Sequence, residues 1–491
     1  MKPGLRTSIR APLLLLLCVG VAASASAQSF KTMFFFDGAN GSDPGSQPIQ
    51  GPDGNLYSTT FFGGAHGNGT IYRISPSGKL TTLYNFCAQA GCPDGASPAG
   101  LTLAPDGNFY GETYNGGSTN GAGTIFRITP QGKLTTLYRF CAKAQCADGA
   151  QPEQPLFLAT DGNFYGTTDG GGTNGFGTIF KVTSKGRLTT IHSFCAKTSC
   201  TDGAYPFSSI MQGRDGNFYG TTAEGGIQNQ VCPQYGCGVA YKLTPQGKYT
   251  TLYHFCSQSN CADGAVPQGG SLLQAADGDF YGTTDNGGEN SEGTAYKITS
   301  TGKATIIHSF CPPTNCDDGA IPYAGLIQGT DGNLYGTASL GGSGGFGLAF
   351  KMTLSGVVTP LYSFNINGVD GSFPSNKVFQ ATDGSLWGTT NQGGKTSCSG
   401  GCGTTFRIKN GLGRFVQAVP TVGGVGAKVI ILGNDLTGAG GLAFNGTPAQ
   451  FRVISASEIE TAVPAGATTG KIKVTGPHGT LLSNVDFRVA Q

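Results

Sequence analysis

Fourteen of the fifteen cysteines in this chain form seven close pairs, so thiol chemistry is the first chemistry that the sequence suggests. Paired cysteines form disulfides in an oxidising compartment, or they supply ligands to zinc, which needs four ligands that converge. Each pair stands alone in its own stretch of sequence, and this isolation favours local disulfides over a metal site. The expected bridges join Cys87 with Cys92, Cys141 with Cys146, Cys195 with Cys200, Cys232 with Cys237, Cys256 with Cys261, Cys311 with Cys316, and Cys398 with Cys402.

Glutamates that interrupt a regular pattern are the candidates for acid–base chemistry. Glu112 replaces a threonine of the pattern, Glu224 precedes an insertion at residues 231–236, and Glu289 lies in an irregular loop. Carboxyl groups of this kind can serve as general acid and base. Because the sequence offers no serine–histidine–acid set and no metal-ligand cluster beside them, we assign no catalytic residue, metal or cofactor.

The elements that must position these residues come from one unit of roughly 54 residues that recurs seven times. Each unit contains an Asp-Gly turn that is typical of a β-hairpin. In the second unit, alternating apolar and polar residues predict strands over 100–105, 108–114, 124–129 and 133–140. Four short strands in each unit predict a seven-bladed β-propeller over residues 28–414. The turns begin at Asp53, Asp106, Asp161, Asp215, Asp277, Asp331 and Asp383.

The two ends of the repeat array predict a closed ring. The seventh unit lacks a good fourth strand, and residues 31–36 near the start of the chain match the fourth strand of the first unit at 79–86. We therefore expect the N-terminal strand to complete the last blade, which would also remove two exposed sheet edges.

The repeat assigns residues to faces of this ring. The first strand of each blade should line the central channel, where Gln212, Gln274 and Gln328 share one position with Gln50 and Gln380. These glutamines and the three glutamates are the candidate ligand-binding residues. The cysteine pairs and the long loops all fall on one face, and loops on a rigid scaffold often carry function.

The N-terminus indicates export. Basic residues, an apolar run over 13–23 and Ala25-Ser26-Ala27 are typical of a signal peptide spanning residues 1–27. The 30 Lys and Arg and 28 Asp and Glu give a charge of +2. Such a balance offers no electrostatic reason to expect a nucleic-acid partner. We expect a secreted, periplasmic or cell-surface protein with no transmembrane segment after signal cleavage.

The repeat resembles the GloVer tandem repeat of exported bacterial proteins. The resemblance rests on residues 161–168, Gly171-Gly172 and 177–183, recurs in all seven units, and covers roughly residues 30 to 410. It implies export and leaves the activity open. The family is named for a variable C-terminal surface anchor, whereas this sequence shows no sorting signal or hydrophobic tail after Phe487, so secretion without an anchor is an alternative.

Residues 415–491 resemble an IPT/TIG domain, an immunoglobulin-like β-sandwich that often accompanies surface receptors and polysaccharide-acting enzymes. The residues that carry the resemblance are Gly426, Val429, Ile431, Gly433, Phe444, Asn445, Gly446, Val463-Pro464, Gly470 and Val474.

Three functions are compatible with these features. The first is a binding module for carbohydrate or extracellular protein that uses the disulfide-stapled loop face. The second is a polysaccharide lyase or glycoside hydrolase on the same face, and the third is a purely structural envelope protein.

Overall fold

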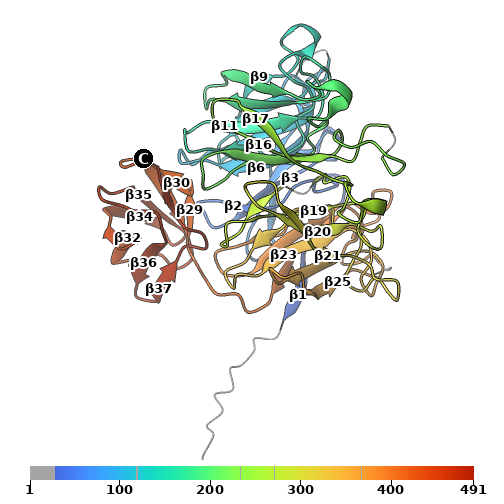
Figure 1. The fold of residues 1–491 in the computed structure, drawn as a ribbon. Coiled ribbons are helices and arrows are strands. Elements are labelled where there is room, and N and C mark those ends of the chain that lie inside the picture. Colours follow the sequence, from blue (N-terminus) through green and yellow to red (C-terminus); the bar gives the residue numbers. More distant parts are fainter. Residues whose placement is uncertain (1–27, 118–119, 233, 270, 366–367, 491) are drawn as a thin grey trace, which may run out of the picture.

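The computed structural model describes residues 28–490 except 118–119, 233, 270 and 366–367, and nearly all its regular structure is β-strand (Figure 1). The all-β prediction is confirmed. The helices of the described residues are three single turns, η1 (Ala144–Cys146), η2 (Thr198–Cys200) and η3 (Ser259–Cys261). None of the described helices is long and apolar enough to cross a membrane. The predicted signal peptide lies outside the described residues.

The repeats form seven four-stranded antiparallel sheets within the described residues, which we name R1 to R7 in chain order. R1 contains β2 (Ile49–Gln50), β3 (Leu56–Thr60), β4 (Thr70–Ile74) and β5 (Leu80–Asn85). R2 contains β6 (Ala96–Leu103), β7 (Phe109–Asn115), β8 (Thr124–Ile128) and β9 (Leu134–Arg139), and R3 contains β10 (Phe157–Leu158), β11 (Phe164–Thr168), β12 (Thr178–Val182) and β13 (Leu188–Ser193). R4 contains β14 (Met211–Gln212), β15 (Phe218–Thr222), β16 (Val239–Leu243) and β17 (Tyr249–His254). R5 contains β18 (Leu273–Gln274), β19 (Phe280–Thr284), β20 (Thr294–Ile298) and β21 (Ala304–Ser309), and R6 contains β22 (Ile327–Gln328), β23 (Leu334–Ala338), β24 (Leu348–Met352) and β25 (Val358–Ser363).

The four strands predicted for the second unit are present in R2, with one difference in the first. We expected a strand over 100–105, but β6 begins at Ala96 and ends at Leu103. Residues 104–108 form the turn instead, because Gly107 donates its N–H to the carbonyl of Ala104 at 2.9 Å and Ala104 donates its N–H to that of Asn108 at 3.0 Å. Pro105 within this turn has no N–H with which to continue the strand.

The N-terminal strand completes the last sheet, as the sequence predicts. R7 consists of β1 (Ser29–Phe35), β28 (Thr404–Lys409), β27 (Leu386–Thr390) and β26 (Phe379–Gln380), in that spatial order. Strand β1 runs antiparallel to β28, with Phe30 opposite Ile408. Phe36 follows β1 and is fully buried, as is Phe86 after the last strand of R1. The two ends of the repeat region are therefore held together by a complete β-ladder.

A backbone contact that we call the clasp joins each sheet to the one before it. It is made by the residue that precedes a proline at the entry to each first strand, and all seven such residues have a positive φ. In R5, the N–H of Val266 donates to the carbonyl of Cys237 in R4 at 2.9 Å. The carbonyl of Val266 accepts the N–H of Asp285 in its own sheet at 3.2 Å. The clasp residues are Asp43, Ser97, Gln151, Tyr205, Val266, Ile321 and Phe373.

The clasp also closes the array. The N–H of Asp43 in R1 donates to the carbonyl of Cys402 in R7 at 3.0 Å. The same peptide geometry that links neighbouring repeats therefore links the last repeat to the first.

The C-terminal residues form separate sheets that lie beside the repeat sheets, at the left of Figure 1 in brown and red. One sheet contains β29 (Gln417–Val419), β31 (Lys428–Leu432), β35 (Glu458–Ala462) and β34 (Phe451–Ser455), in that spatial order. A second contains β33 (Thr447–Pro448), β32 (Gly441–Phe444), β36 (Ile472–Gly476) and β37 (Gly479–Leu482), and β30 (Val422–Gly423) pairs in parallel with β38 (Arg488–Val489). These sheets enclose a core of their own that includes Val429, Phe444 and Phe487.

The C-terminal sheets also pack directly on the repeats. Val419, Ile430 and Leu432 belong to the same buried cluster as Tyr57 of R1 and Phe109 of R2. Asn434 adds a hydrogen bond of 2.6 Å to the hydroxyl of Thr382 in R7. Burial of apolar side chains from both parts fixes how they meet.

Closure by β1 can be tested at Phe36. Replacing this fully buried side chain with alanine should cost about 3–5 kcal/mol of unfolding free energy, because it leaves a cavity that the core fills only in part. Denaturant unfolding of the mature chain measures this loss. Phe62 is 49% exposed, and Phe62→Ala is the control, with an expected change within about 0.5 kcal/mol. Equal effects of the two substitutions would contradict the role of Phe36 in closure.

Candidate functional site

The first strands of R1 to R5 line a central cavity of about 820 Å³, and Tyr323 of R6 with residues 375–377 and Asn391 of R7 complete the wall on the repeat side. The C-terminal sheets contribute residues 417–422, Val485, Asp486 and Arg488 to its wall. The Arg488 guanidinium donates to the carbonyl of Gly213 and, at 3.3 Å, to Oε1 of Gln212. The C-terminal part therefore covers the end of the cavity next to the Asp-Gly turns, which leaves the opposite end, beside the clasps, as the mouth.

The predicted glutamines lie at the covered end and join neighbouring sheets. Oε1 of Gln212 accepts the N–H of Thr160 in R3 at 3.1 Å, and its Nε2 donates to Gly216 in its own sheet at 2.8 Å. Gln274 and Gln328 make the equivalent pairs of contacts, with donor–acceptor distances between 2.8 and 2.9 Å. Gln212 and Gln274 line the cavity as expected, whereas Gln328, predicted to do the same, is not part of the lining. Backbone groups occupy both ends of all three amides.

The structure places the three predicted glutamates in three different surroundings. Glu112 is fully buried in β7 and neither carboxyl oxygen has a hydrogen-bond partner, so burial raises its pKa well above the usual range. Glu224 is half-buried directly beyond β15, and burial raises its pKa too. Glu289 is exposed, in a separate surface hollow beside β21. The three residues do not form one site.

Other acidic residues gather at the mouth, and our sequence reasoning missed them. Asp169 and Asp285 occupy the same repeat position, directly after the second strands β11 and β19. Their exposed fractions are 4% and 5%. Glu153 and Asp43, from the entries to the first strands of R3 and R1, line the cavity itself. The sequence does contain a signal for the two aspartates, because the residue at their repeat position varies from repeat to repeat. In the other five repeats this position holds Phe61, Tyr114, Ala223, Ser339 and Asn391.

Asp169 and Glu153 form a carboxyl pair. Burial raises the pKa of Asp169 well above the usual range, and the neighbouring charge and hydrogen bond of Glu153 raise it further. Glu112 adds a smaller charge effect in the same direction. With its pKa raised in this way, Asp169 keeps its proton to a higher pH than an exposed aspartate does. Such a pair can donate a proton or a hydrogen bond at neutral pH.

Burial shifts the pKa values of the other titratable groups at the mouth in the direction that favours their uncharged forms. It raises the pKa of Asp285 to about 7 and that of Asp43 to about 6. It lowers the pKa of Lys377, whose ammonium contacts the hydroxyl of Ser271, to about 8. Burial and then the charges of Glu153, Asp285 and Asp169 raise the pKa of Tyr323, which lines the cavity together with Glu153. The mouth therefore offers donors and acceptors of little net charge beside an aromatic ring.

All seven predicted disulfides are present, and five of them lie in the loop that follows a fourth strand. In each of these five loops the carbonyl of the second cysteine accepts two glycine N–H groups, at 2.7 to 3.0 Å. The disulfide therefore fixes the position of this cysteine carbonyl, and the two hydrogen bonds that the carbonyl accepts hold two loops together. The five bridges join Cys87 with Cys92, Cys141 with Cys146, Cys195 with Cys200, Cys256 with Cys261, and Cys311 with Cys316.

The five loops do not share one backbone conformation, although the spacing of their cysteines is the same. In R2, R3 and R4 the second cysteine ends one of the single helical turns η1, η2 and η3. Cys92 in R1 and Cys316 in R5 close their bridges from non-helical turns. Cys92 donates its N–H to the carbonyl of Gln89 at 3.0 Å, whereas in R5 Asn315 donates to Pro312 at 3.2 Å. The same cysteine spacing thus accommodates more than one loop conformation.

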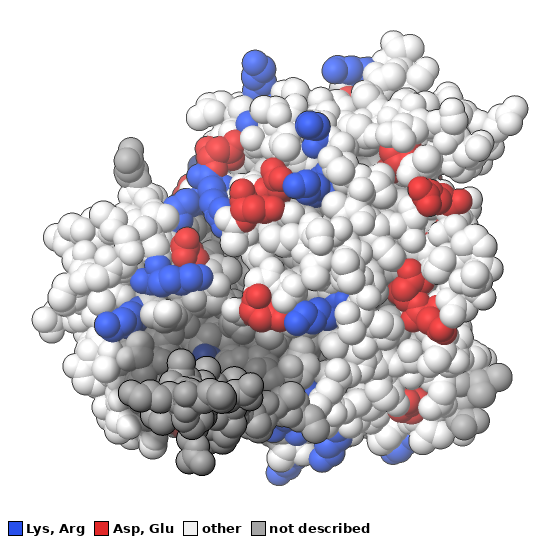
Figure 2. Space-filling view, turned by 60° about the horizontal axis from the view of Figure 1, so that its bottom comes forward, with Lys and Arg blue, Asp and Glu red and all other residues white. Residues whose placement is uncertain are grey.

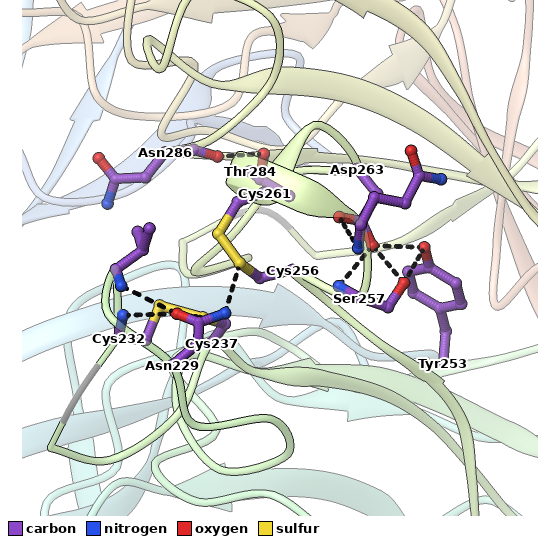
Figure 3. The surroundings of a disulfide bond; sticks show 12 residues. Asn229, Cys232, Cys237, Tyr253, Cys256, Ser257, Cys261, Asp263, Thr284 and Asn286 are labelled. Carbon is purple, nitrogen blue, oxygen red and sulfur yellow. Dashed lines mark hydrogen bonds between the residues drawn. A yellow bond between two sulfur atoms is a disulfide. The ribbon is translucent and has the colours of Figure 1, made fainter.

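The expectation that each pair stands alone is wrong for two of the disulfides. The insertion between β15 and β16 folds back and places Cys232–Cys237 against Cys256–Cys261, which follows β17 (Figure 3). Across the described part of the chain, the one group of potential metal ligands close enough to share an ion is Cys237, Cys256 and Cys261. The acids of the mouth are not among them.

The surface carries mixed charge on the face shown in Figure 2. Basic and acidic side chains alternate there between broad uncharged areas. An interspersed pattern of this kind creates no extended field of one sign.

The seven sheets and the cavity that they surround define a propeller-like all-β fold. A solved structure supports this class: virginiamycin B lyase from Staphylococcus aureus is 16% identical, with 78% of this chain and 99% of that chain covered at a TM-score of 0.50. A periplasmic gluconolactonase from Pseudomonas aeruginosa is also similar, at 18% identity, with 72% and 98% covered and a TM-score of 0.42.

The chain belongs to the Gloeobacter/Verrucomicrobia repeat family, whose model matches residues 21–232 and 231–447. This match confirms the family resemblance expected from the repeat. No curated protein matches the chain.

The raised pKa values at the mouth predict how stability depends on pH. The folded chain keeps protons on Asp285 and Asp43 that the unfolded chain releases above the ordinary pKa of 3.8. Stability should therefore fall as the pH rises from about 4 to about 7. Asp285→Asn and Asp43→Asn should each flatten this fall, which thermal unfolding at several pH values measures.

Two half-buried histidines act in the opposite direction within this window, because burial lowers the pKa of His192 and His254 below 6.5 and makes stability rise with pH there. The contribution of each aspartate is therefore taken from the difference between its variant and the wild type. The pKa of Asp215 is lowered to about 2 by hydrogen bonds from Asn217, Tyr219 and Lys242 that outweigh burial, so its contribution is lost only below the window. Glu289→Gln, at an exposed carboxylate, is the control and should keep the wild-type slope. A wild-type slope in both aspartate variants would contradict the assignment.

Proposed function

We propose that this protein is an exported binding module that takes up part of a carbohydrate at the mouth of its central cavity. The observation that carries the proposal is the group of acids at the mouth: Asp43 and Glu153 line the cavity together with Tyr323, and burial raises the pKa of Asp43, Asp169 and Asp285. Sugar hydroxyls need donors and acceptors in close alternation, and the apolar face of a sugar ring packs on aromatic side chains. The mouth combines both features.

The size of the cavity supports a small ligand or the end of a longer chain. Its volume of about 820 Å³ falls within the range of roughly 300–1,000 Å³ usual for ligand sites. Phe61 and Asn391 add a second aromatic ring and an amide to the lining. The covered far end favours a ligand that enters from the loop face and stops inside.

The proposal includes an architecture. Residues 1–27 are a signal peptide, residues 28–414 form a seven-bladed β-propeller with R1 to R7 as blades, and residues 415–491 form an IPT/TIG-like β-sandwich. Seven local disulfides support an oxidising, extracytoplasmic location. The propeller would provide the site, and the sandwich would cover its far end.

A second candidate function is a lyase or glycoside hydrolase at the same mouth. The carboxyl pair of Asp169 and Glu153 favours it, since a protonated carboxyl with a raised pKa can act as a general acid. In this reading Asp169 would protonate the leaving oxygen of a glycosidic bond. An enzyme would shorten the oligosaccharide that a binding module only holds.

A glycan array tests the binding function. The probes are neutral and acidic oligosaccharides from plant and bacterial polysaccharides, applied to the mature chain and to the near-isosteric variants Glu153→Gln and Asp169→Asn. We expect selective binding by the wild type and at least a tenfold loss in each variant, since removal of one partner from a buried hydrogen bond costs about 1–3 kcal/mol.

Glu289→Gln is the matched control, because it makes the same chemical change at an exposed site away from the mouth. No binding by the wild type, or equal losses in the mouth variants and the control, would contradict the proposal. Mass spectrometry of the bound oligosaccharides then distinguishes the two functions. Shortened products that disappear with Asp169→Asn would establish the enzyme.

A further inference from the structure

The two adjacent disulfides of R4 bring four cysteine sulfurs into one buried cluster (Figure 3). The Sγ atoms of Cys237, Cys256 and Cys261 lie within 4.8 Å of one another, and Cys232 is bonded to Cys237. The exposed fractions of the four residues range from 0% to 9%. Four sulfurs that share one enclosed volume are the ligand set of a structural zinc site.

The cluster depends on the insertion that is particular to R4. Cys256–Cys261 has the repeat's usual position after the fourth strand, whereas Cys232–Cys237 lies in the loop between β15 and β16. Within the described residues, the grouping of three or more close metal-ligand atoms occurs here alone. The insertion thus places a second cysteine pair directly against a repeat pair.

A neighbouring amide already orients one of the sulfurs. Asn229 donates an Nδ2–H to Sγ of Cys256 at 2.9 Å. Its Oδ1 accepts the backbone N–H groups of Val231 and Cys232 at 2.9 and 3.1 Å, which fixes the side chain. An N–H that points at a thiolate stabilises its charge and orients it as a metal ligand.

We propose that, after reduction, Cys232, Cys237, Cys256 and Cys261 bind one zinc ion as a four-thiolate site. Each disulfide takes two electrons from the reductant and yields two thiols: a phosphine becomes the phosphine oxide and water supplies the two protons, whereas a dithiol supplies both electrons and protons and becomes a disulfide. Zinc then displaces the four thiol protons. At a Zn–S distance of about 2.3 Å, tetrahedral sulfurs lie about 3.8 Å apart. The sulfurs of Cys237, Cys256 and Cys261 already lie within 4.8 Å of one another, so reduction of the Cys256–Cys261 bond leaves them near enough to reach that spacing.

The oxidised state and the reduced, zinc-bound state would connect the two cysteine-bearing loops of R4 by different bonds. In the oxidised state each disulfide closes its own loop, and no covalent bond joins the insertion to the segment after β17. In the reduced state the metal would bridge the two segments. The loop face of R4 would therefore remain cross-linked in a reducing environment in which the other disulfides open.

The test compares the wild type with two double variants. Cys232→Ser with Cys237→Ser removes the insertion pair, and Cys141→Ser with Cys146→Ser removes the pair of R2. The R2 pair is a matched control because it has the same sequence separation of 5 and an amide contact from Asn120 to Sγ of Cys141, at 3.4 Å. Each protein is reduced with a phosphine under native conditions, loaded with zinc and desalted.

We expect one tightly bound zinc per chain in the wild type and in the R2 variant, and none in the insertion variant, as measured with a chromogenic chelator. Cobalt in place of zinc should give the absorption bands of a tetrahedral thiolate site with the same dependence on the variants. Asn229→Ala keeps all four thiols and should weaken zinc binding about 10- to 100-fold. Near-ultraviolet circular dichroism verifies that the reduced proteins stay folded.

Three results would overturn the proposal. They are the absence of stoichiometric zinc in the folded reduced wild type, equal loss of zinc in both double variants, and a new disulfide between the two pairs formed in place of metal binding. Peptide mapping after alkylation detects the third.

Discussion

The clasp between successive sheets is the constraint on which the rest of the structure depends. The clasp residue donates its N–H to the preceding sheet in every repeat, and in R1 and R3 to R7 its carbonyl accepts an N–H from its own sheet, so one backbone hydrogen bond in each repeat links neighbouring sheets. The residue must take a left-handed φ to do this. Val266 and Ile321 do so at 58° and 52° although β-branched side chains disfavour that region. The ring can hold this strain because the contact recurs around it.

The clasp also determines where the candidate site lies. The carbonyls of Gln151 and Val266 accept the N–H groups of Asp169 and Asp285 at 3.1 and 3.2 Å. Two aspartates at one repeat position are thereby held near the mouth of the cavity, on a scaffold that cannot relax to solvate them. Their raised pKa values follow from that confinement, and groups held away from their preferred charge state are frequent at functional sites. Burial of these acids reduces the folding stability of the protein locally, at the place where a ligand would bind.

Polar residues with similar sequence patterns have opposite roles at the two ends of the cavity. At the covered end, the glutamines recur in most repeats, and backbone partners satisfy them. At the mouth, the acids differ from repeat to repeat, and no backbone group of the described residues pairs with the carboxyl oxygens of Asp169. Regular recurrence therefore accompanies structural pairing, whereas the irregular acids have no such pairing. The same contrast separates the insertion pair of R4 from the recurring cysteine pairs.

The sequence by itself determined the repeat, the four strands of each unit, the seven disulfides and the pairing of the first strand with the last sheet. These features depend on residues close in sequence, or on a pattern that recurs, and local propensity and side-chain alternation encode both. Only the tertiary structure decided which acids meet, because Glu153, Asp169, Asp285 and Tyr323 come from three repeats. It also decided that Glu112, Glu224 and Glu289 lie apart and that two cysteine pairs converge. Long-range proximity follows from how sheets stack around a centre, and no single stretch of sequence records that geometry.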